Sequence, residues 1–390
     1  MMRDGYKQTE VGVIPDDWGI KCLKDDILLL SGHHVLSQYC NTHGEGFPYL
    51  TGPADFPNGK IKQTKFTNKP TTVCSENDLL ITVKGSGSGS MIQADGAYCI
   101  SRQLMAIRVQ GWESKFVSYS LLQNASRIRE ASTGLIPGLS RSDILEQRIP
   151  IPKTKKEQKA IAQALSDVDE LIASLEKLMA KKRDIKTATM QQLLTGKKRL
   201  PGYGEGKGYK QTELGEIPED WEVTRFGSIV DYVSSGKTST KQNGGNIPLY
   251  GSTGLIGFSW QGEYKGKALL VARVGANAGS LNIVDGVYGV SDNTIIVKID
   301  NKHDINFYEY QLIIKRLNRL VFGSGQPLIT GTQLKELFIV EPSYKEQKAI
   351  AQVLSDIDSD LSTIESKLQK TKSLKQGMMQ ELLTGKTRLL

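Results

Sequence analysis

Two glycine-rich segments could bind phosphate or a nucleotide cofactor. The segment "SGKTST" at 235–240 has the glycine, lysine and threonine that end a phosphate-binding loop, but Asp231 stands where such a loop needs its first glycine. The segment "FGSGQP" at 322–327 resembles an adenosyl-cofactor turn, but it follows a helical pattern and lacks an acidic residue at the expected later spacing. We therefore interpret both segments as loops.

Histidine and cysteine gather at His33, His34, Cys40 and His43, and this combination could bind zinc. The second half of the sequence has no counterpart of the cluster, and its surroundings are typical of a loop. A polar loop is the favoured interpretation, with a zinc site as the open alternative.

The sequence also lacks a motif that base methylation needs. No two prolines are adjacent, so the Asn/Asp-Pro-Pro-aromatic tetrapeptide with which amino-methyltransferases hold a target base is absent. We predict no catalytic residue in this chain.

Composition indicates an ordinary globular protein with a modest basic excess. Apolar residues make up 38% of the 390 residues, and the net charge of +8 slightly favours a polyanionic partner. No apolar run approaches the roughly 20 residues that span a bilayer, and the N-terminus "MMRDGYKQTE" lacks the apolar core of a signal peptide. The four cysteines have no CxxC spacing, so we expect free thiols, a cytoplasmic location and no membrane contact.

Large parts of the sequence occur twice. The segment "YKQTEVGVIPDDW" at 6–18 returns as "YKQTELGEIPEDW" at 209–221 with ten of thirteen residues identical, and residues 156–200 match 345–389 at 24 of 45 positions. Between these blocks the sequence has diverged, but 78–103 and 268–293 keep the same leucine, glycine, tyrosine and serine positions. The chain is therefore a tandem duplication, and its middle segments share one fold with different surfaces.

A long helix is predicted in each late block. Apolar residues recur in steps of four and three, and Thr154-x-x-Glu157 and Ser343-x-x-Glu346 fit capping boxes. Gly196 and Gly385 stand where a left-handed C-terminal cap would be, which gives about 41 residues or ~60 Å per helix. The expected coiled-coil interface consists of Ile161, Leu165, Val168, Ile172, Leu175, Met179, Ile350, Leu354, Ile357, Leu361, Ile364 and Leu368.

Each stripe is too narrow to be buried by its own helix, so we predict that the two helices pair antiparallel, as a pseudo-twofold arrangement. The alternative is two amphipathic helices on separate cores, which breaks in the heptad pattern at Lys182 and Thr371 would allow. Strand-like runs and helical patches give each middle segment an α+β composition. The predicted boundaries are a first domain at 1–152, helices at 153–199 and 342–390, a glycine-rich linker at 200–208 and a second domain at 209–341.

These motifs resemble the DNA specificity (S) subunit of Type I restriction-modification systems. The resemblance rests on "TELGEIPEDW", "IPLYGSTGLIG", "GSGQPLITGTQL", "KEQKAIAQ" and "LLTGK.RL", in an order that covers nearly the whole chain; "STGLIPGLSRSDI" at 132–144 matches only loosely. It implies two target-recognition domains, each reading one half of a gapped asymmetric DNA site. It also implies helices that set the spacing and dock two methyltransferase subunits, with restriction/translocase subunits in the wider complex. S-adenosylmethionine, ATP and Mg²⁺ would belong to those partners.

Base readout favours Arg, Lys, Asn and Gln with Ser and Thr as adaptable partners, and Lys and Arg also bind phosphate. Arg273 is a candidate for reading guanine, and Arg102 and Asp292 occupy equivalent positions with opposite charge. Two other functions stay open, a coiled-coil adaptor without base readout and the recognition module of a combined restriction enzyme. The predicted DNA-binding residues are Lys60, Lys62, Lys65, Lys84, Ser86, Ser88, Arg102, Gln103, Lys237, Thr238, Lys241, Gln242, Arg273, Asn277 and Asn293.

Overall fold

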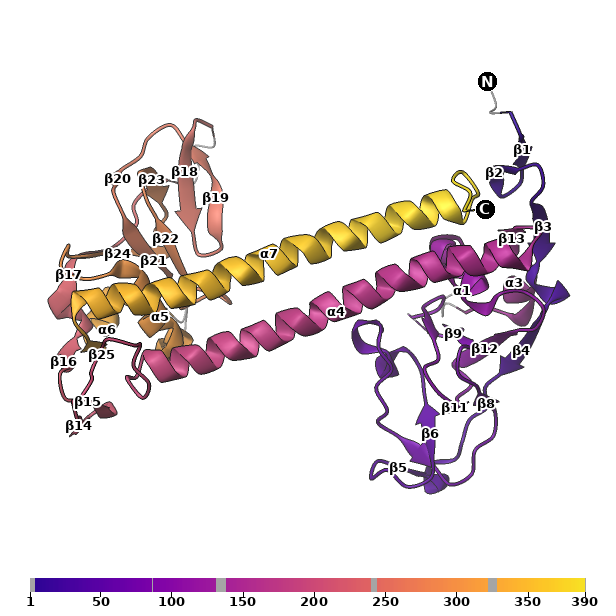
Figure 1. Cartoon of the computed structure of the whole chain (residues 1–390), viewed down its shortest axis with the longest axis horizontal. Coiled ribbons are helices and arrows are strands. Elements are labelled where there is room, and N and C mark those ends of the chain that lie inside the picture. The colour runs from indigo at the N-terminus through magenta and orange to yellow at the C-terminus, as the bar shows by residue number, and fades with distance from the viewer. Residues whose placement is uncertain (1–3, 86, 131–137, 240–243, 322–327, 390) are drawn as a thin grey trace. The chain divides into compact units, whose positions relative to one another are not determined.

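The chain forms two compact units that share two long helices (Figure 1). A computed structural model describes residues 4–85, 87–130, 138–239, 244–321 and 328–389. The first unit is Met1–Glu176 with Lys367–Leu390, and the second is Lys177–Ser366. The predicted domain segments 1–152 and 209–341 each fall within one unit, and both unit boundaries fall inside a long helix.

The long helices α4 (Lys155–Leu193) and α7 (Tyr344–Leu382) have 39 residues each, or about 58 Å. At their starts the Thr154 and Ser343 hydroxyls accept hydrogen bonds from the backbone N–H groups of Glu157 and Glu346. At their ends Gly196 and Gly385 adopt φ of +72° and +70°, as left-handed caps require. The predicted helices, the Thr154 and Ser343 hydroxyl caps and the glycine caps are therefore confirmed.

Pairing of α4 with α7 is antiparallel in each unit. In the first unit Lys375 Nζ lies 2.6 Å from Asp169 and Lys372 Nζ lies 2.9 Å from Glu176. In the second unit Lys186 lies 2.5 Å from Asp358. The residue number rises along α4 as it falls along α7, and all twelve predicted interface residues are buried or half-buried. The predicted antiparallel coiled coil is confirmed.

A further contact repeats around these ion pairs. The Tyr119 hydroxyl donates to Asp169 at 2.7 Å, and the Tyr310 hydroxyl donates to Asp358 at 2.8 Å. Burial raises the pKa of both tyrosines, so their hydroxyls stay protonated as donors. Each domain is thereby attached to the helix pair by the same set of side chains.

The first domain contains two sheets. One is antiparallel in the order β10-β9-β12-β4, and the other has the order β5-β7-β6-β11-β8 with a parallel β6–β11 pair. The strands are β4 (Ile27–Ser31), β5 (Cys40–Asn41), β6 (Phe47–Leu50), β7 (Phe66–Thr67), β8 (Val73–Cys74), β9 (Leu79–Thr82), β10 (Met91–Gln93), β11 (Tyr98–Ile100) and β12 (Leu104–Val109). The helices are α1 (Ser114–Gln123), α2 (Ala125–Glu130) and α3 (Arg141–Leu145).

The second domain repeats this topology except that its described residues include no counterpart of β5. Its sheets have the orders β17-β24-β21-β22 and β19-β18-β23-β20, again with one parallel pair, β18–β23. The strands are β17 (Val230–Ser235), β18 (Ile247–Gly251), β19 (Gly254–Ser259), β20 (Tyr264–Lys265), β21 (Ala268–Ala272), β22 (Leu281–Val284), β23 (Val287–Val290) and β24 (Thr294–Ile299). The helices are α5 (Ile305–Ile314) and α6 (Gly331–Lys335).

Short two-stranded ribbons flank both domains and link them to the helices. The ribbons pair β1 (Tyr6–Thr9) with β2 (Gly12–Pro15), β3 (Gly19–Cys22) with β13 (Arg148–Ile151), β14 (Tyr209–Thr212) with β15 (Gly215–Pro218), and β16 (Glu222–Arg225) with β25 (Phe338–Glu341).

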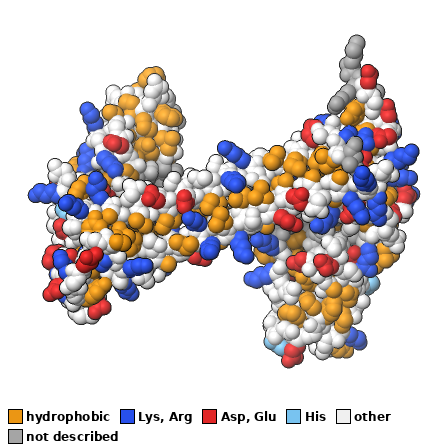
Figure 2. All heavy atoms as spheres, in the orientation of Figure 1, with side chains coloured by type: hydrophobic (Ala, Val, Ile, Leu, Met, Phe, Trp, Pro, Cys, Tyr) orange, Lys and Arg blue, Asp and Glu red, His pale blue; other side chains and the backbone are white. Residues whose placement is uncertain are grey.

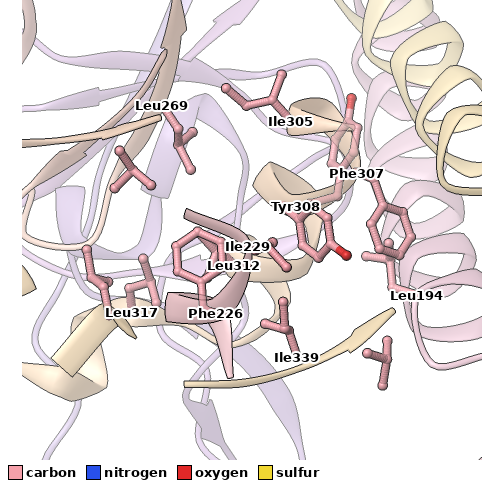
Figure 3. Close-up of a cluster of buried hydrophobic side chains, with 14 of the residues drawn as sticks. Leu194, Phe226, Ile229, Leu269, Ile305, Phe307, Tyr308, Leu312, Leu317 and Ile339 are labelled. Atoms are coloured by element: carbon pink, nitrogen blue, oxygen red, sulfur yellow. The ribbon is translucent and has the colours of Figure 1, made fainter. Parts of the chain in front are cut away.

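Each long helix contributes to both hydrophobic cores. Ile161 and Leu165 at the start of α4 pack in the first unit's core, whereas Leu193, which ends α4, and Leu194 pack in the second unit's core. Figure 3 shows Leu194 beside Phe307, together with Phe226 of the same core. Among the described residues no helix has the length and apolarity that crossing a membrane requires.

The repeated sequence blocks meet where each long helix begins. In the second unit the Arg199 guanidinium binds Glu346 at 2.5 Å and Asp220 at 2.9 Å, and it lies over the ring of Trp221. In the first unit Arg388 makes the equivalent contacts with Glu157, Asp17 and Trp18. We call these two clusters the Arg199 joint (Arg199, Asp220, Trp221, Glu346) and the Arg388 joint (Arg388, Asp17, Trp18, Glu157).

The joints change the role expected for the two glutamates. Glu157 and Glu346 were predicted as the side-chain half of a capping box, but their carboxylates bind Arg388 and Arg199. The next residue completes the attachment, because Gln158 accepts from the Glu113 N–H and Gln347 accepts from the Asp304 N–H, each at 2.9 Å. These contacts explain why "KEQ" is repeated.

Candidate nucleic-acid interface

The same backbone hydrogen bonds bring loops at the strand ends together in each domain. In the first domain the Ser101 N–H donates to Leu50 at 2.9 Å and the Val83 N–H donates to Gln103 at 2.8 Å. In the second domain Ser291 donates to Tyr250 at 2.9 Å and Arg273 donates to Asn293 at 3.1 Å. The loop cluster of each domain is therefore built on one backbone plan, and its positions can be compared one by one.

The first loop cluster comprises residues 32–35, 51–55, 83–85, 87–90 and 101–103, and the second comprises residues 236–239, 251–254, 273–280 and 291–293. Both lie at strand ends, where side chains can vary without disturbing the sheets. Figure 2 shows lysine and arginine side chains scattered over the face in view rather than gathered in one patch. Charge on this face therefore does not mark an interface, and the loop clusters are the candidate.

A glycine allows the close approach on which each loop cluster depends. A Cβ at Gly32 would collide with the carbonyl oxygen of Ser101, and one at Gly236 would collide with the carbonyl oxygens of Val290 and Ser291. Gly236 thus leaves β17 against the β23–β24 turn, and β18 is the next described element. A phosphate-binding loop at 235–240 would need a helix directly after its glycine and lysine, and the described residues 237–239 and 244–246 are not helical, which argues against that alternative.

The first loop cluster borders a cavity of about 490 Å³ whose lining includes Lys65, Arg102 and Gln103. His34 and Tyr49 complete the polar wall. Burial raises the pKa of Tyr49, so its hydroxyl stays neutral. This cavity can donate several hydrogen bonds to an anionic or carbonyl-rich surface.

The second loop cluster borders a cavity of about 370 Å³ with different chemistry. Thr253, Asn277, Asn282 and Thr294 contribute to its lining, and no lysine or arginine does so among the described residues. Amides and hydroxyls can both donate and accept hydrogen bonds. The cavity beside the first loop cluster is therefore cationic, and the cavity beside the second is lined by neutral polar groups from other backbone positions.

Other predicted residues of the first domain lie at varied depths. Lys60, Lys62 and Lys84 are exposed on loops, where they can contact phosphate. Ser88 is only 6% exposed, and its hydroxyl has no hydrogen-bond partner among the described residues. Ser86 lies outside the described residues.

The remaining predicted residues of the second domain also divide into exposed and buried. Lys237 and Asn293 are exposed, and Arg273 is half-buried beside a third cavity. Thr238 is buried, with its hydroxyl bonded to Glu263 and accepting from the Val290 N–H at 2.9 Å. Thr238 therefore supports the loop from inside. Lys241 and Gln242 lie outside the described residues.

The histidine and cysteine cluster is divided among separate contacts. His33 Nδ1 lies 2.8 Å from the Thr72 hydroxyl, His43 faces Glu45, and His34 and Cys40 line the first cavity. No group of three or more His, Cys, Asp or Glu side chains in the described part of the chain is arranged to hold a metal ion.

The roles of the joint arginines and of Asp55 were not predicted from the sequence. Arg199 and Arg388 could have been found, because "TGK.RL" is repeated with the same arginine in both copies. Asp55 had no such signal. It is buried, accepts hydrogen bonds from the Thr51 N–H and the Thr51 and Thr64 hydroxyls, and thereby shapes the loop that only the first domain has.

Comparison with known proteins identifies the relatives of this arrangement. Residues 15–183 and 218–376 match the Type I restriction modification DNA specificity domain. The MjaVIII specificity subunit of a Type I restriction enzyme from Methanocaldococcus jannaschii is 27% identical over 418 residues, covering 99% of this chain and 96% of the relative. The putative MjaX specificity subunit of the same organism is 26% identical over 428 residues, covering 99% and 97%.

A solved structure has a similar fold. The crystal structure of the S subunit of a Type-I restriction-modification system from M. genitalium superimposes with a TM-score of 0.69 at 19% identity. The similarity covers 98% of this chain and 99% of that chain. The fold therefore extends to both domains and both long helices of that protein.

Proposed function

Because the chain belongs to the family of Type I restriction modification DNA specificity domains, we propose that each of its two domains reads one half of a gapped, asymmetric DNA site. The observation that carries this proposal is the pair of loop clusters. Their backbone hydrogen bonds are the same, but Arg102 and Gln103 in one are Asp292 and Asn293 in the other. Equivalent positions with different donors and acceptors would select different bases.

The proposed base contacts come from residues that are exposed or line the two cavities. In the first domain these are Arg102 and Gln103, supported by Lys65, and in the second they are Asn277 and Asn293. The exposed lysines Lys60, Lys62, Lys84 and Lys237 are assigned to phosphates, because a lysine on a flexible loop supplies charge without fixed geometry.

The antiparallel helices are proposed as the ruler between the half-sites. Helices of about 58 Å suit half-sites roughly one DNA turn apart, which leaves a non-contacted spacer of about 5 to 8 bp. A heptad inserted after Ser174 needs a matching heptad after Lys370, because only then do Asp169 and Lys375 on one side, and Lys186 and Asp358 on the other, stay paired. The double insertion lengthens the helices by about 10 Å and should widen the spacer by about 3 bp. An unchanged spacer would refute the ruler.

Catalysis is assigned to partner subunits. The chain lacks the proline-containing tetrapeptide of amino-methyltransferases, and its "SGKTST" segment does not form a phosphate-binding loop. S-adenosylmethionine, ATP and Mg²⁺ would therefore be bound by two methyltransferase subunits and by restriction/translocase subunits. The repeated helices would present one docking surface twice.

Mapping of methylated bases tests this function. The chain is expressed with its modification subunits in a host without other methyltransferases, and the modified positions of the host genome are sequenced. The proposal predicts two different half-sequences separated by a fixed gap. A contiguous site would contradict the two-domain readout, and methylation without sequence preference would favour the adaptor alternative.

A further inference from the structure

A third cavity of about 270 Å³ opens beside the second loop cluster. Its polar lining comes from Arg273, Lys335, Ser234, Ser235, Thr330 and Thr332. No acidic residue is among the described residues that line it, and neither Arg273 nor Lys335 takes part in an ion pair between described residues. Two cations and four hydroxyl side chains without a carboxylate favour an anionic ligand.

The Arg273 guanidinium has unused hydrogen-bonding capacity. Its Nη1 lies 3.5 Å from the Asp292 carbonyl oxygen, and its buried Nε has no hydrogen-bond partner in the described structure. A buried charged donor without an acceptor is costly, so an acceptor from a ligand would stabilise it. The contact with Asp292 places this arginine next to the turn assigned to base reading.

The first domain supplies an arginine at the same place from a different element. The residue equivalent to Arg273 is Val83. The Val83 N–H donates to Gln103 and its carbonyl accepts from Leu139, and in the same way the Arg273 N–H donates to Asn293 and its carbonyl accepts from Ile329. The first residue of α3 is Arg141, and the first residue of α6 is Gly331. The first domain thus has Val83 and Arg141 at the two positions where the second domain has Arg273 and Gly331.

The two arginines converge on equivalent serines. Arg141 Nη1 donates to the Ser31 hydroxyl at 2.7 Å, and Ser235 lines the cavity with Arg273. Ser31 pairs with Met105 at the end of β4, as Ser235 pairs with Ile295 at the end of β17. A guanidinium is therefore kept beside this serine although the chain position that provides it has changed.

We propose that Arg141 and Arg273 each bind a phosphate of the DNA backbone, as one anchor per half-site; this rests on the proposed function. The neighbouring turn residues differ in charge and length between the domains, whereas the guanidinium is retained. The ligand must therefore be a group that every half-site has, and the phosphodiester is that group. Arg273 is accordingly assigned to phosphate rather than to guanine.

Salt dependence of DNA binding tests the assignment. The full chain with its modification subunits is titrated with one cognate and one unrelated duplex at several salt concentrations. Arg273→Val and Arg141→Gly, which introduce the residue of the opposite domain, should each weaken both duplexes about tenfold. Each should reduce the slope of log K against log salt by about 0.9. Lys302→Ala, an exposed lysine outside the loop clusters, should leave the slope unchanged.

A double variant that moves the arginine to the other position distinguishes a lost phosphate contact from a failure to fold. Val83→Arg combined with Arg141→Gly moves the guanidinium to the wall used in the second domain, and it should restore the slope lost in Arg141→Gly alone. If Arg273→Val does not fold, Arg273→Lys keeps the charge and should keep the slope with weaker binding.

Three results would overturn the assignment. They are weakening confined to the cognate duplex with an unchanged slope, no change in binding to either duplex, and loss of the modification subunits with DNA binding intact. A wild-type complex without sequence preference would instead refute the proposed function, because the slopes are measured on any duplex.

Discussion

The turns at 101–103 and 291–293 occupy the same backbone position in the two domains but carry opposite charge. Ser101 and Ser291 each donate to the preceding strand of the parallel pair, and the following residues are Arg102 and Asp292. By contrast, the Arg199 and Arg388 joints keep every side chain. The two copies have thus kept the side chains that attach each domain to the helices, whereas the exposed turn residues have diverged.

Breaking the joints tests the conserved side of this comparison and should have the largest effect. Arg199→Ala removes the cation from the Glu346 carboxylate, whose side chain is 1% exposed, and leaves it, of its described partners, only the Trp221 indole N–H, at a cost of about 3 to 5 kcal/mol. Arg388→Ala should cost less, about 2 to 3 kcal/mol, because Arg388 is more exposed. Hydrogen exchange of residues 209–225 and 6–22 measures the local opening free energy.

The matched control for the joints is Lys207→Ala, which removes only the exposed partner of Asp220. Its exchange should stay close to that of the wild type. Greater loosening in Arg388→Ala than in Arg199→Ala would contradict the order derived from burial.

Exchanging the recognition turns tests the divergent side. Asp292→Arg with Asn293→Gln gives the second domain the turn of the first, and should change base preference in one half-site by about 1 to 3 kcal/mol. Arg102→Asp with Gln103→Asn is the reciprocal variant and should change only the other half-site. Sequencing of methylated sites reads both outcomes, and a change in both half-sites from one variant would contradict independent reading.

Acid pH should weaken the Arg199 joint by a smaller amount than the arginine substitutions do. Hydrogen bonds from Arg199 lower the pKa of Asp220 to about 2, below its ordinary value of 3.8. The unfolded chain therefore binds more protons in this range, and the stability contributed by Asp220 is present above about pH 4 and lost towards pH 2.

Acid unfolding of Arg199→Ala should lack that contribution, which amounts to about 1 to 2 kcal/mol. Tryptophan fluorescence followed from pH 5 to pH 2 would detect the difference. Arg388 also lowers the pKa of Asp17, so the first unit should respond in the same direction. An unchanged acid transition in Arg199→Ala would show that Asp220 is not stabilised by this contact.

The smallest expected effect concerns the helix pairing, where the two units are nearly identical. Lys375 and Asp169 have side-chain exposures of 23% and 38%, and Lys186 and Asp358 have 22% and 40%. Each pair should contribute about 0.2 to 1 kcal/mol, and the two should be equal within error. Double-mutant cycles with Lys→Met and Asp→Asn measure the coupling energy of each pair. A difference above 1 kcal/mol between the two coupling energies would contradict the equivalence of the two units.

The sequence predicted the long helices because their signals are local. The stripe from Ile161 to Met179 and the glycine caps Gly196 and Gly385 depend on neighbouring residues, and antiparallel pairing follows from two equivalent stripes. The repeat likewise predicted one fold for both domains, and the sheet orders confirm it.

The joints and the loop clusters depend on contacts that spacing alone does not reveal. Arg388 meets Glu157 across 231 positions, and the arginine exchange appears only when Val83 is matched to Arg273 through hydrogen bonds. Thr238 was a reasonable DNA contact by residue type, but the close packing of Gly236 turns its hydroxyl inward. Side-chain direction at a strand end is decided by tertiary packing, which residue type does not encode.

The most direct test of the central claim replaces residues 209–341 with a second copy of residues 6–152, joined at the same ribbon and helix starts. The methylated site of the resulting complex is then sequenced. If each domain reads its own half-site and the helices set the gap, the site should become a palindrome of the first half-sequence with an unchanged spacer. Retention of the original asymmetric site, or a changed spacer with both helices intact, would contradict the account.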